Sequence, residues 1–310
     1  MMTEASSQVR SGVQFGLLIT ALGGFLFTFD LPLLRLAAAD KWTMVFARGV
    51  LLFASITITW WLVQRVSAER RPFIAGAAGL AVVGTNTIAN IAYIGSITET
   101  HAANVVFILA LVPILTAIFS RIFISEQVHS VTWLAAALSF LGVGIIVWDG
   151  VHSGKLFGDF LALVCACCTA AAFTIIRASG RNVATSLGLG SLVSAAVALL
   201  FFPVDFASLL NVTSFGMPAW FWIALNGFIA IPIASTLIAN GPRFLPSVDV
   251  SMFFLLETVL TPIWIWFLFN EQPSNAVLLG GALVVVTLVA HSFWRLRQSL
   301  GKAQSTSSPH

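Results

Sequence analysis

The sequence predicts an all-α membrane protein: ten transmembrane helices form two inverted five-helix repeats, and both termini are cytoplasmic. Composition is the first observation that supports this fold class. The 310 residues are 58% hydrophobic and only 9% charged, with a mean hydropathy of +0.97, whereas soluble domains carry about 25% charged residues. The other two observations are an internal repeat and an uneven distribution of basic residues between the predicted connections.

Ten apolar segments are long enough to cross a bilayer, because a spanning helix needs about 20 apolar residues. We expect them at 12–34, 43–63, 73–96, 101–123, 130–148, 157–177, 185–203, 218–240, 247–269 and 275–295. The first is longer than the apolar core of a signal peptide, so we expect it to be retained. The connections are short, and no sizeable soluble domain is expected.

The chain repeats itself at an offset of 145 residues, which places Glu126-Gln127 on Glu271-Gln272, each pair at the end of a long apolar segment. The same offset superposes Thr116 on Thr261, Leu111 on Leu256, Leu134 on Leu279 and Ala137 on Ala282. We therefore expect a first repeat at 12–150, a second at 157–295 and a polar cytoplasmic tail at 296–310. Because five is odd, the second repeat enters the bilayer upside down.

Basic residues gather on one side of the predicted membrane. With a cytoplasmic N-terminus, the inner face carries Arg10, Arg65, Arg70, Arg71, Arg121, Arg177, Arg181, Arg243, Arg295, Arg297 and Lys302. The outer face carries only Arg35, Lys41 and Lys155, while Arg48 lies within a span. Cytoplasmic connections are enriched in Lys and Arg, so this distribution predicts that both termini are inside.

An inverted duplication of this kind is typical of secondary transporters. Two related bundles can rock about a two-fold axis in the membrane plane, so that a central site faces each side in turn. The alternative is that duplication only enlarged a scaffold. Prolines within spans remove a helical hydrogen bond and permit kinks, and Pro113, Pro232 and Pro262 are therefore candidate gating positions.

The residues resemble the drug/metabolite transporter superfamily, and within it the EamA-like exporters, over nearly the whole chain. The family's fourth helix runs from a proline to a glutamate that ends the helix, here Pro113 and Glu126. The second half has Glu271, but Thr258 stands at the matching proline position and the proline is displaced to Pro262. The run Arg48-Gly-Val-Leu-Leu-Phe also looks like the family's second helix.

Within this group the sequence is most similar to bacterial aromatic amino acid exporters. The resemblance implies a multi-pass protein of the bacterial inner membrane that exports amino acids or related small metabolites by alternating access. Export of other neutral or cationic organic compounds is the alternative. The expected partners are a small-molecule substrate and the lipid bilayer, with no nucleic acid. The oligomeric state is left open, with a monomer as one alternative.

Few polar residues lie deep in the predicted spans, and each needs a partner, a wet cavity or a ligand. Glu257 lies about ten residues into its span, near mid-depth. An ionised carboxylate there could carry a proton or bind a substrate ammonium. The alternative is a protonated glutamate that bonds to a neighbouring helix.

Asp30 and Arg48 lie at similar depth, because they are four and five residues from the outer ends of their spans. We expect them to form a structural ion pair, since breaking a buried pair leaves one charge without a partner. Substrate contact is the alternative reading.

Asn86 and Asn90 are one helical turn apart and share a face. Asn226 lies at a comparable depth in a later span. Amides bind amino and carboxylate groups without a permanent charge, so the three are candidate ligands for a zwitterionic substrate. Alternatively, they hold helices together. Three phenylalanines could form the apolar wall of a cavity: Phe107, Phe253 and Phe254. The alternative is that they face lipid.

Other functional classes are not supported. An intramembrane enzyme needs a nucleophile with a base, paired aspartates or a metal, and the sequence has neither His-Glu-x-x-His nor Gly-x-Gly-Asp. Cys165 and Cys168 have helical spacing but no clustered histidine, so no metal site and no cofactor are expected. No P-loop is present. Arg48 alone could bind phosphate, which favours neutral, zwitterionic or apolar substrates.

Overall fold

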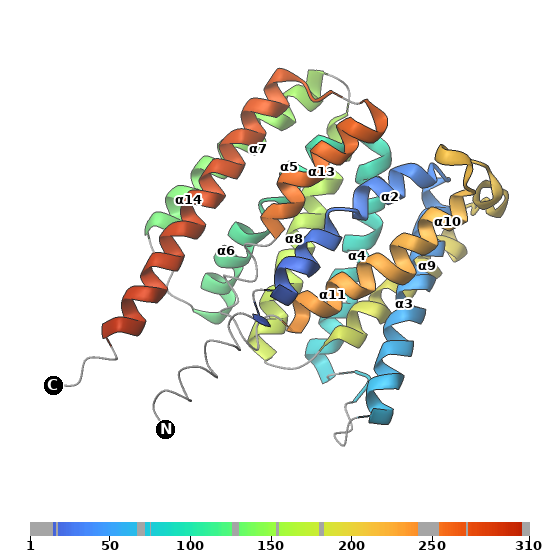
Figure 1. Cartoon of the computed structure of the whole chain (residues 1–310), viewed down its shortest axis with the longest axis horizontal. Helices are drawn as coiled ribbons and strands as arrows, with labels where there is room; N and C mark the ends of the chain where they lie inside the picture. The colour runs from blue at the N-terminus through green and yellow to red at the C-terminus, as the bar shows by residue number, and fades with distance from the viewer. Residues whose placement is uncertain are drawn as a thin grey trace.

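The computed structural model describes residues 15–16, 18–66, 72–74, 76–125, 130–152, 155–179, 183–240, 254–270 and 272–305. This part of the chain is almost entirely helical, and its only β-type pairing is an isolated bridge between Val212 and Pro218. Seven helical segments within it are long and apolar enough to cross a membrane. The predicted helical membrane fold is thus present in the structure (Figure 1).

The first half begins with a helical segment, Leu18–Ala37, that is interrupted by a turn at Thr28–Phe29. The part of this segment after the turn is α2 (Asp30–Ala37). The helices that follow are α3 (Lys41–Val66), α4 (Gly76–Glu99), α5 (Ala102–Leu109), α6 (Val112–Ile124) and α7 (Ser130–His152). The span expected at 101–123 is therefore two helices. Pro113 lies in the first turn of α6, where its missing N–H prevents an unbroken hydrogen-bond ladder with α5.

The second half contains a more irregular span. Its elements are α8 (Leu156–Ser179), α9 (Ala184–Phe201), η1 (Phe206–Leu210), η2 (Ser214–Gly216), α10 (Ala219–Ala224), η3 (Leu225–Ala230), α11 (Ile231–Asn240), α13 (Phe254–Phe269) and α14 (Asn275–Ser305). The segments α10, η3 and α11 run on continuously, with η3 as a π-helical turn between them. This turn contributes a side chain to the polar network described below.

Helices of the two halves contact each other in a symmetric order. The pairs α3 with α9, α5 with α13 and α7 with α14 each join corresponding members of the two halves, and α7 and α14 lie side by side in Figure 1. When the two halves are exchanged, the contact of α4 with α8 corresponds to the contact of α2 with α10. In the same way, the contact of α6 with α8 corresponds to the contact of α2 with α13. Exchanging the halves therefore leaves this set of contacts unchanged.

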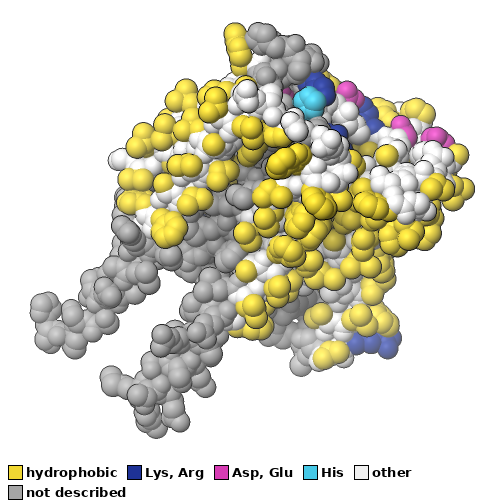
Figure 2. Space-filling model, turned by 45° about the horizontal axis from the view of Figure 1, so that its top comes forward, with side chains coloured by type: hydrophobic (Ala, Val, Ile, Leu, Met, Phe, Trp, Pro, Cys, Tyr) yellow, Lys and Arg dark blue, Asp and Glu magenta, His cyan; other side chains and the backbone are white. Residues whose placement is uncertain are grey.

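The surface between the two ends is apolar. Figure 2 shows hydrophobic side chains over most of the described face, with charged side chains gathered at its edges. Large apolar side chains are strongly exposed on several helices, among them Phe123, Leu200 and Phe267. Such side chains are stable at a surface that contacts lipid rather than water.

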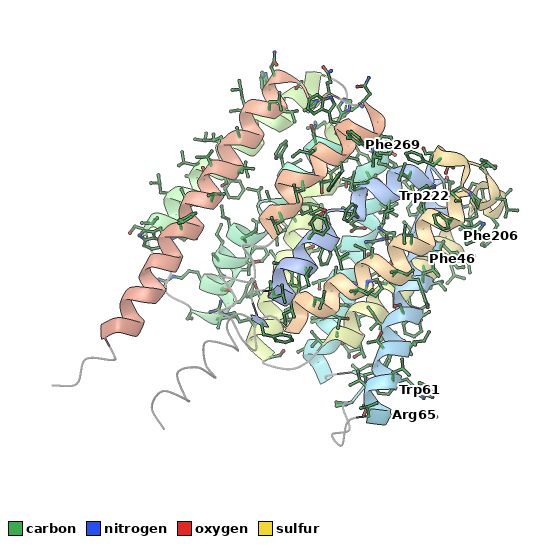
Figure 3. The ribbon with its side chains drawn as sticks, viewed as in Figure 1. Phe46, Trp61, Arg65, Phe206, Trp222 and Phe269 are labelled. Atoms are coloured by element: carbon green, nitrogen blue, oxygen red, sulfur yellow. The ribbon has the colours of Figure 1, made fainter. Side chains whose placement is uncertain are left out.

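Aromatic side chains mark both ends of α3 (Figure 3). Near its beginning, Phe46 meets Phe206 edge to face with ring centroids 5.5 Å apart. Near its end, the Arg65 guanidinium lies 4.0 Å above the centroid of the Trp61 ring. Aromatic and basic residues at helix ends are typical of the membrane–water interfaces.

Glycine allows α3 and α9 to approach closely. A Cβ atom added at Gly49 would collide with the carbonyl oxygen of Ser191 and lie 2.9 Å from the Cβ of Ala195. Both neighbours are backbone or adjacent to it, so neither can move without shifting α9. In contrast, a Cβ at Gly84 on α4 would meet no atom of the described residues within 4 Å.

We predict that Gly49→Ala lowers the free energy of unfolding by about 1–3 kcal/mol, the usual cost of overpacking. Gly84→Ala is the matched control and should leave stability unchanged or slightly raised, since alanine favours helix. Thermal unfolding of the purified variants in detergent measures both effects. Equal stability of Gly49→Ala and wild type would contradict the close packing of α3 on α9.

Candidate functional site

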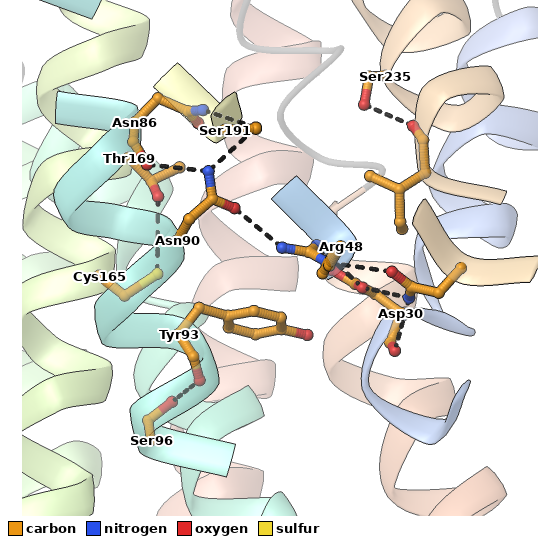
Figure 4. A network of polar contacts seen from close by, with 12 residues as sticks. Asp30, Arg48, Asn86, Asn90, Tyr93, Ser96, Cys165, Thr169, Ser191 and Ser235 are labelled. Carbon is orange, nitrogen blue, oxygen red and sulfur yellow. Dashed lines mark hydrogen bonds and ion pairs between the residues drawn. The ribbon is translucent and has the colours of Figure 1, made fainter. Parts of the chain in front are cut away.

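The guanidinium of Arg48, on α3, bonds to side chains from three other elements. Its Nη2 lies 3.1 and 3.0 Å from the two carboxylate oxygens of Asp30, with which it forms an ion pair. Nε donates to Asn226 Oδ1 at 3.0 Å, and Nη1 donates to Asn90 Oδ1 at 2.9 Å. We call Asp30, Arg48, Asn90 and Asn226 the arginine network. Figure 4 shows Arg48 between Asn90 and Asp30.

Asp30 is the first residue of α2 and follows the turn at Thr28–Phe29. A helix N-terminus carries partial positive charge, which favours a carboxylate at this position. Pro32 cannot donate to the carbonyl of Thr28, four residues earlier, and that oxygen accepts instead from the Thr261 hydroxyl of α13 at 3.1 Å. The break in this span therefore presents Asp30 to Arg48, and a side chain from the second half stabilises it.

Asn226 lies in the π-helical turn η3 and is fully buried. Its Nδ2 donates to the backbone oxygen and to Oδ1 of Asp30, at 3.0 and 2.7 Å. Pro232 has no N–H for the carbonyl of Phe228, which accepts from Ser55 Oγ of α3 at 2.9 Å. π-Helical turns are rare and occur frequently at functional sites, and this one directs a side chain into the arginine network.

Asn86 and Asn90 extend the network to α9. Asn90 Nδ2 donates to Ser191 Oγ at 3.2 Å and to the backbone oxygen of Asn86 at 3.0 Å. Asn86 Nδ2 donates to the Leu187 backbone oxygen at 2.7 Å and to Ser191 Oγ at 3.3 Å. A Cβ at Gly190 would lie 2.9 Å from that of Asn86, so glycine is needed at this contact. Ser191 and Gly190 were not among the sequence candidates.

The arginine network therefore joins the two halves. Arg48, Asp30 and Asn90 belong to the first half, while Asn226 and Ser191 belong to the second. The side chains of Arg48 and Asp30 are only 6% and 7% exposed. In a low-dielectric interior, a charge without its partners is strongly unfavourable. Any movement between the halves has to preserve or exchange these contacts.

Glu257 is the fourth residue of α13 and is half-buried. Asp30 and Arg48 both act on its carboxyl group electrostatically, so it lies close to the arginine network. Its carboxylate has no hydrogen-bond partner among the residues that the structure describes. Asp30 already compensates Arg48, and an ionised Glu257 adds negative charge to this region.

Tyr93 is a residue of the site that the sequence candidates did not include. Its ring lies on α4, and the Arg48 Cζ is 5.4 Å from the ring centroid, a cation–π distance. The side chain is buried, and its hydroxyl has no hydrogen-bond partner among the described residues. The signal available in the sequence was its rarity, since it is the single tyrosine beside 26 Phe and 10 Trp.

Among the remaining sequence candidates, the position of Phe107 is described in full. Phe107 is buried in a separate apolar cluster with Ala103 and Val277, against Gly281 of α14. Phe253 lies outside the described residues. Phe254 and Pro262 belong to α13, but their side chains are not described.

A second buried polar cluster lies where α4, α5 and α8 meet. Asp159, near the start of α8, accepts from the Thr100 hydroxyl at 2.7 Å and from Asn104 Nδ2 at 3.0 Å. Arg35 Nη2 donates to the backbone oxygen of Thr100 at 2.8 Å. This cluster ties the end of α2 to the start of α8, and sequence analysis had not singled it out apart from the position of Arg35.

Metal ligands do not cluster in the described part of the chain, where no three His, Cys, Asp or Glu side chains could hold one ion together. Cys165 is buried and Cys167 and Cys168 are partly buried, all three as free thiols.

The sequence profile of the EamA-like transporter family matches residues 10–148 and again residues 156–293. The chain belongs to the EamA-like transporter family. The two matches cover most of both halves and show that the family domain is duplicated. This duplication explains why the helix contacts are symmetric, because the two halves are related units.

Three relatives carry the name of uncharacterised transporters. One from Synechocystis sp. is 24% identical over 68% of this chain, and the match spans 63% of that relative's length. One from Pseudomonas aeruginosa is 24% identical over 94% of this chain and 97% of its own. One from Archaeoglobus fulgidus is 22% identical, and the match covers 84% of this chain and 89% of the relative. These names and the family point to transport rather than catalysis.

A crystal structure of another protein has the same fold, with a TM-score of 0.62 and 18% sequence identity. The match covers 93% of this chain and 99% of the other chain. Together with the apolar helices, the family match identifies a multi-pass bacterial membrane transporter. Such a protein acts on a small-molecule substrate from within a lipid bilayer.

We predict that Asp30→Asn and Arg48→Met each destabilise the protein by about 3–5 kcal/mol, because each leaves the partner's charge buried. The double variant Asp30→Asn/Arg48→Met should lose less than the sum of the two single losses. Thermal unfolding in detergent gives the comparison.

Lys41→Gln provides the matched control. Lys41 pairs with Glu99 at 2.8 Å, but both side chains are partly exposed, at 30% and 39%, and such pairs contribute about 0–1 kcal/mol. Strict additivity of the Asp30 and Arg48 substitutions would show that the two charges are not coupled.

Proposed function

We propose that this EamA-like protein exports amino acids, aromatic ones first among them, or related small metabolites across the bacterial inner membrane by alternating access. The proposed architecture is ten transmembrane helices in two inverted repeats, with both termini in the cytoplasm. The duplicated family match and the symmetric helix contacts support it. The excess of Lys and Arg in the connections assigned to the inner face supports the orientation.

The observation that carries the proposal is a buried polar centre made by both halves. Charged and amide side chains are costly in a membrane interior and mark substrate or ion pathways. Here Arg48 binds partners from both halves, and Glu257 of α13 lies beside them without a hydrogen-bond partner among the described residues. A site at the interface of two rocking halves is what alternating access requires.

Within this centre we assign different roles to the residues. Both amide hydrogens of Asn226 are used by Asp30, so Asn226 and the Asp30–Arg48 ion pair hold the site in shape. Glu257 binds the charged group of the substrate. Asn86 and Asn90, which are only partly buried, contact its polar groups when their bonds to Ser191 exchange.

Gating is assigned to the irregular helices. Pro113 at the α5–α6 break, Pro232 after the π-helical turn and Pro262 in α13 are positions at which a span can bend. Phe107 packs against α14 in this state. We assign Phe107, Phe253 and Phe254 to the apolar wall of the cavity that opens during transport.

Purified protein in liposomes tests this function. We expect it to accelerate the flux of L-phenylalanine and L-tryptophan at least tenfold over protein-free liposomes, and more than the flux of L-aspartate, whose second carboxylate faces Glu257. Glu257→Gln, which keeps the Asp30–Arg48 ion pair, is the control variant with reduced flux and is reconstituted to the same density. An unchanged flux for every amino acid would overturn the proposed substrate class.

A second candidate function is efflux of other organic cations, as a drug exporter performs. Glu257 favours it, because its carboxylate has no basic side chain bonded to it in the described residues. Flux of a lipophilic cation such as ethidium, with none of the amino acids, would select this alternative.

We predict that Glu257→Gln reduces substrate flux at least tenfold and abolishes its response to a pH gradient, because the amide has no charge and carries no proton. The groups that act on Glu257 are Asp30 and Arg48, and these are unchanged in the variant. Flux in liposomes at several pH gradients is the measurement. Wild-type flux with a wild-type pH response would remove Glu257 from the mechanism.

A further inference from the structure

Tyr93 and Glu257 are two polar side chains of the site that make no hydrogen bond to another described residue. Tyr93 comes from α4 in the first half and Glu257 from α13 in the second. Tyr93 is only 6% exposed, and its buried hydroxyl has no partner in the described part of the chain. A buried hydroxyl in this condition has lost its bonds to water and gained none in return, which is unfavourable unless a ligand supplies them.

The hydroxyl is directed toward the charged centre rather than into the apolar core. Figure 4 shows the ring extending from α4 toward Arg48 and Asp30. The charged groups that act on Tyr93 are Asp30, Glu257 and Arg48. One face of the ring is occupied by the guanidinium of Arg48 at 5.4 Å, and the hydroxyl remains available to a ligand.

The charges around this hydroxyl favour a cation. Asp30 and Arg48 form an ion pair and compensate each other. Of the guanidinium donors, Nε, Nη2 and one hydrogen of Nη1 are already used within the arginine network. An ionised Glu257 is then the uncompensated charge, and the Tyr93 hydroxyl oxygen is an additional acceptor near it. This combination suits a ligand with positive charge and at least two N–H donors.

We propose that Tyr93 and Glu257 together bind the protonated primary amine of the transported molecule. One ammonium N–H donates to the Glu257 carboxylate, and another donates to the Tyr93 hydroxyl oxygen. The site thereby selects primary amines, including zwitterionic amino acids, over quaternary ammonium compounds, which carry the same charge but have no N–H. This proposal rests on the proposed function and assigns the substrate class and a further specificity residue.

Binding to the purified full-length protein tests the proposal independently of transport. The probes are phenethylamine and its N,N,N-trimethyl derivative, titrated calorimetrically into wild type and Tyr93→Phe. The variant removes only the hydroxyl and keeps the ring against Arg48. We expect the Kd for phenethylamine to rise about tenfold, as for loss of one hydrogen bond to a charged group, and the Kd for the trimethyl derivative to change less than twofold.

Two controls separate ligand contact from a structural role. Ser120→Ala removes another buried hydroxyl that has no partner among the residues the structure describes, and it should leave both Kd values unchanged. The Tm of ligand-free Tyr93→Phe should equal or exceed that of wild type, because no hydrogen bond is lost. A lowered Tm would indicate a structural hydroxyl and overturn the proposal.

The other possible results of the titrations also distinguish between the proposals. Equal Kd values of wild type and Tyr93→Phe for phenethylamine, or equal weakening for both probes, would overturn the proposal, as would wild type that binds neither probe. Binding that responds to Tyr93→Phe as expected, in a protein that moves no amino acid in liposomes, would support the amine site and reject the proposed export function.

Discussion

Arg48 is a permanently charged side chain in the interior of an apolar helix bundle, and the polar architecture around it follows from that fact. A guanidinium cannot lose its proton to escape burial, so it needs acceptors fixed in several directions. The ion pair with Asp30 supplies the opposite charge, and the amide oxygens of Asn90 and Asn226 occupy further donors. Because these acceptors come from separate helices, their positions relative to one another are coupled through one side chain.

The irregular helix segments are what allow these acceptors to converge. Asp30 follows a turn within its span, and Asn226 lies in a π-helical turn. Each irregularity is followed by a proline, which leaves one backbone carbonyl without a helical N–H donor. That carbonyl accepts a hydrogen bond from a hydroxyl of the opposite half: Thr28 from Thr261, and Phe228 from Ser55. Such bonds stabilise a break that lipid could not satisfy. The same bonds join the halves at the points where the spans can bend.

The site combines a satisfied framework with unsatisfied groups. In the framework, Asn226 uses both amide hydrogens on Asp30, and Ser191 connects Asn86 and Asn90. Tyr93 and Glu257 lie beside this framework without hydrogen-bond partners in the described residues. A rigid network that positions a few unpartnered groups is a suitable arrangement for ligand recognition, since the framework limits the reorganisation that binding requires.

The sequence by itself determined the class of protein and the duplication, and it predicted the depth of its polar residues. Composition and segment length are enough for the first, because so few charged residues and ten membrane-length apolar segments are typical of a polytopic membrane protein. Depth follows from position along a span, which is why Asp30 and Arg48 could be expected at one level. Tertiary structure decided the direction in which each side chain points. Helices that are apolar on every face carry no pattern to mark the inward side. Packing therefore decided that Asn226 contacts Arg48, which is 178 residues away in the sequence. It also decided that Ser191 links Asn86 to Asn90 and that Tyr93 lies beside Arg48. The π-helical turn and the helix break before α2 likewise depend on hydroxyls from distant helices, which local sequence does not contain.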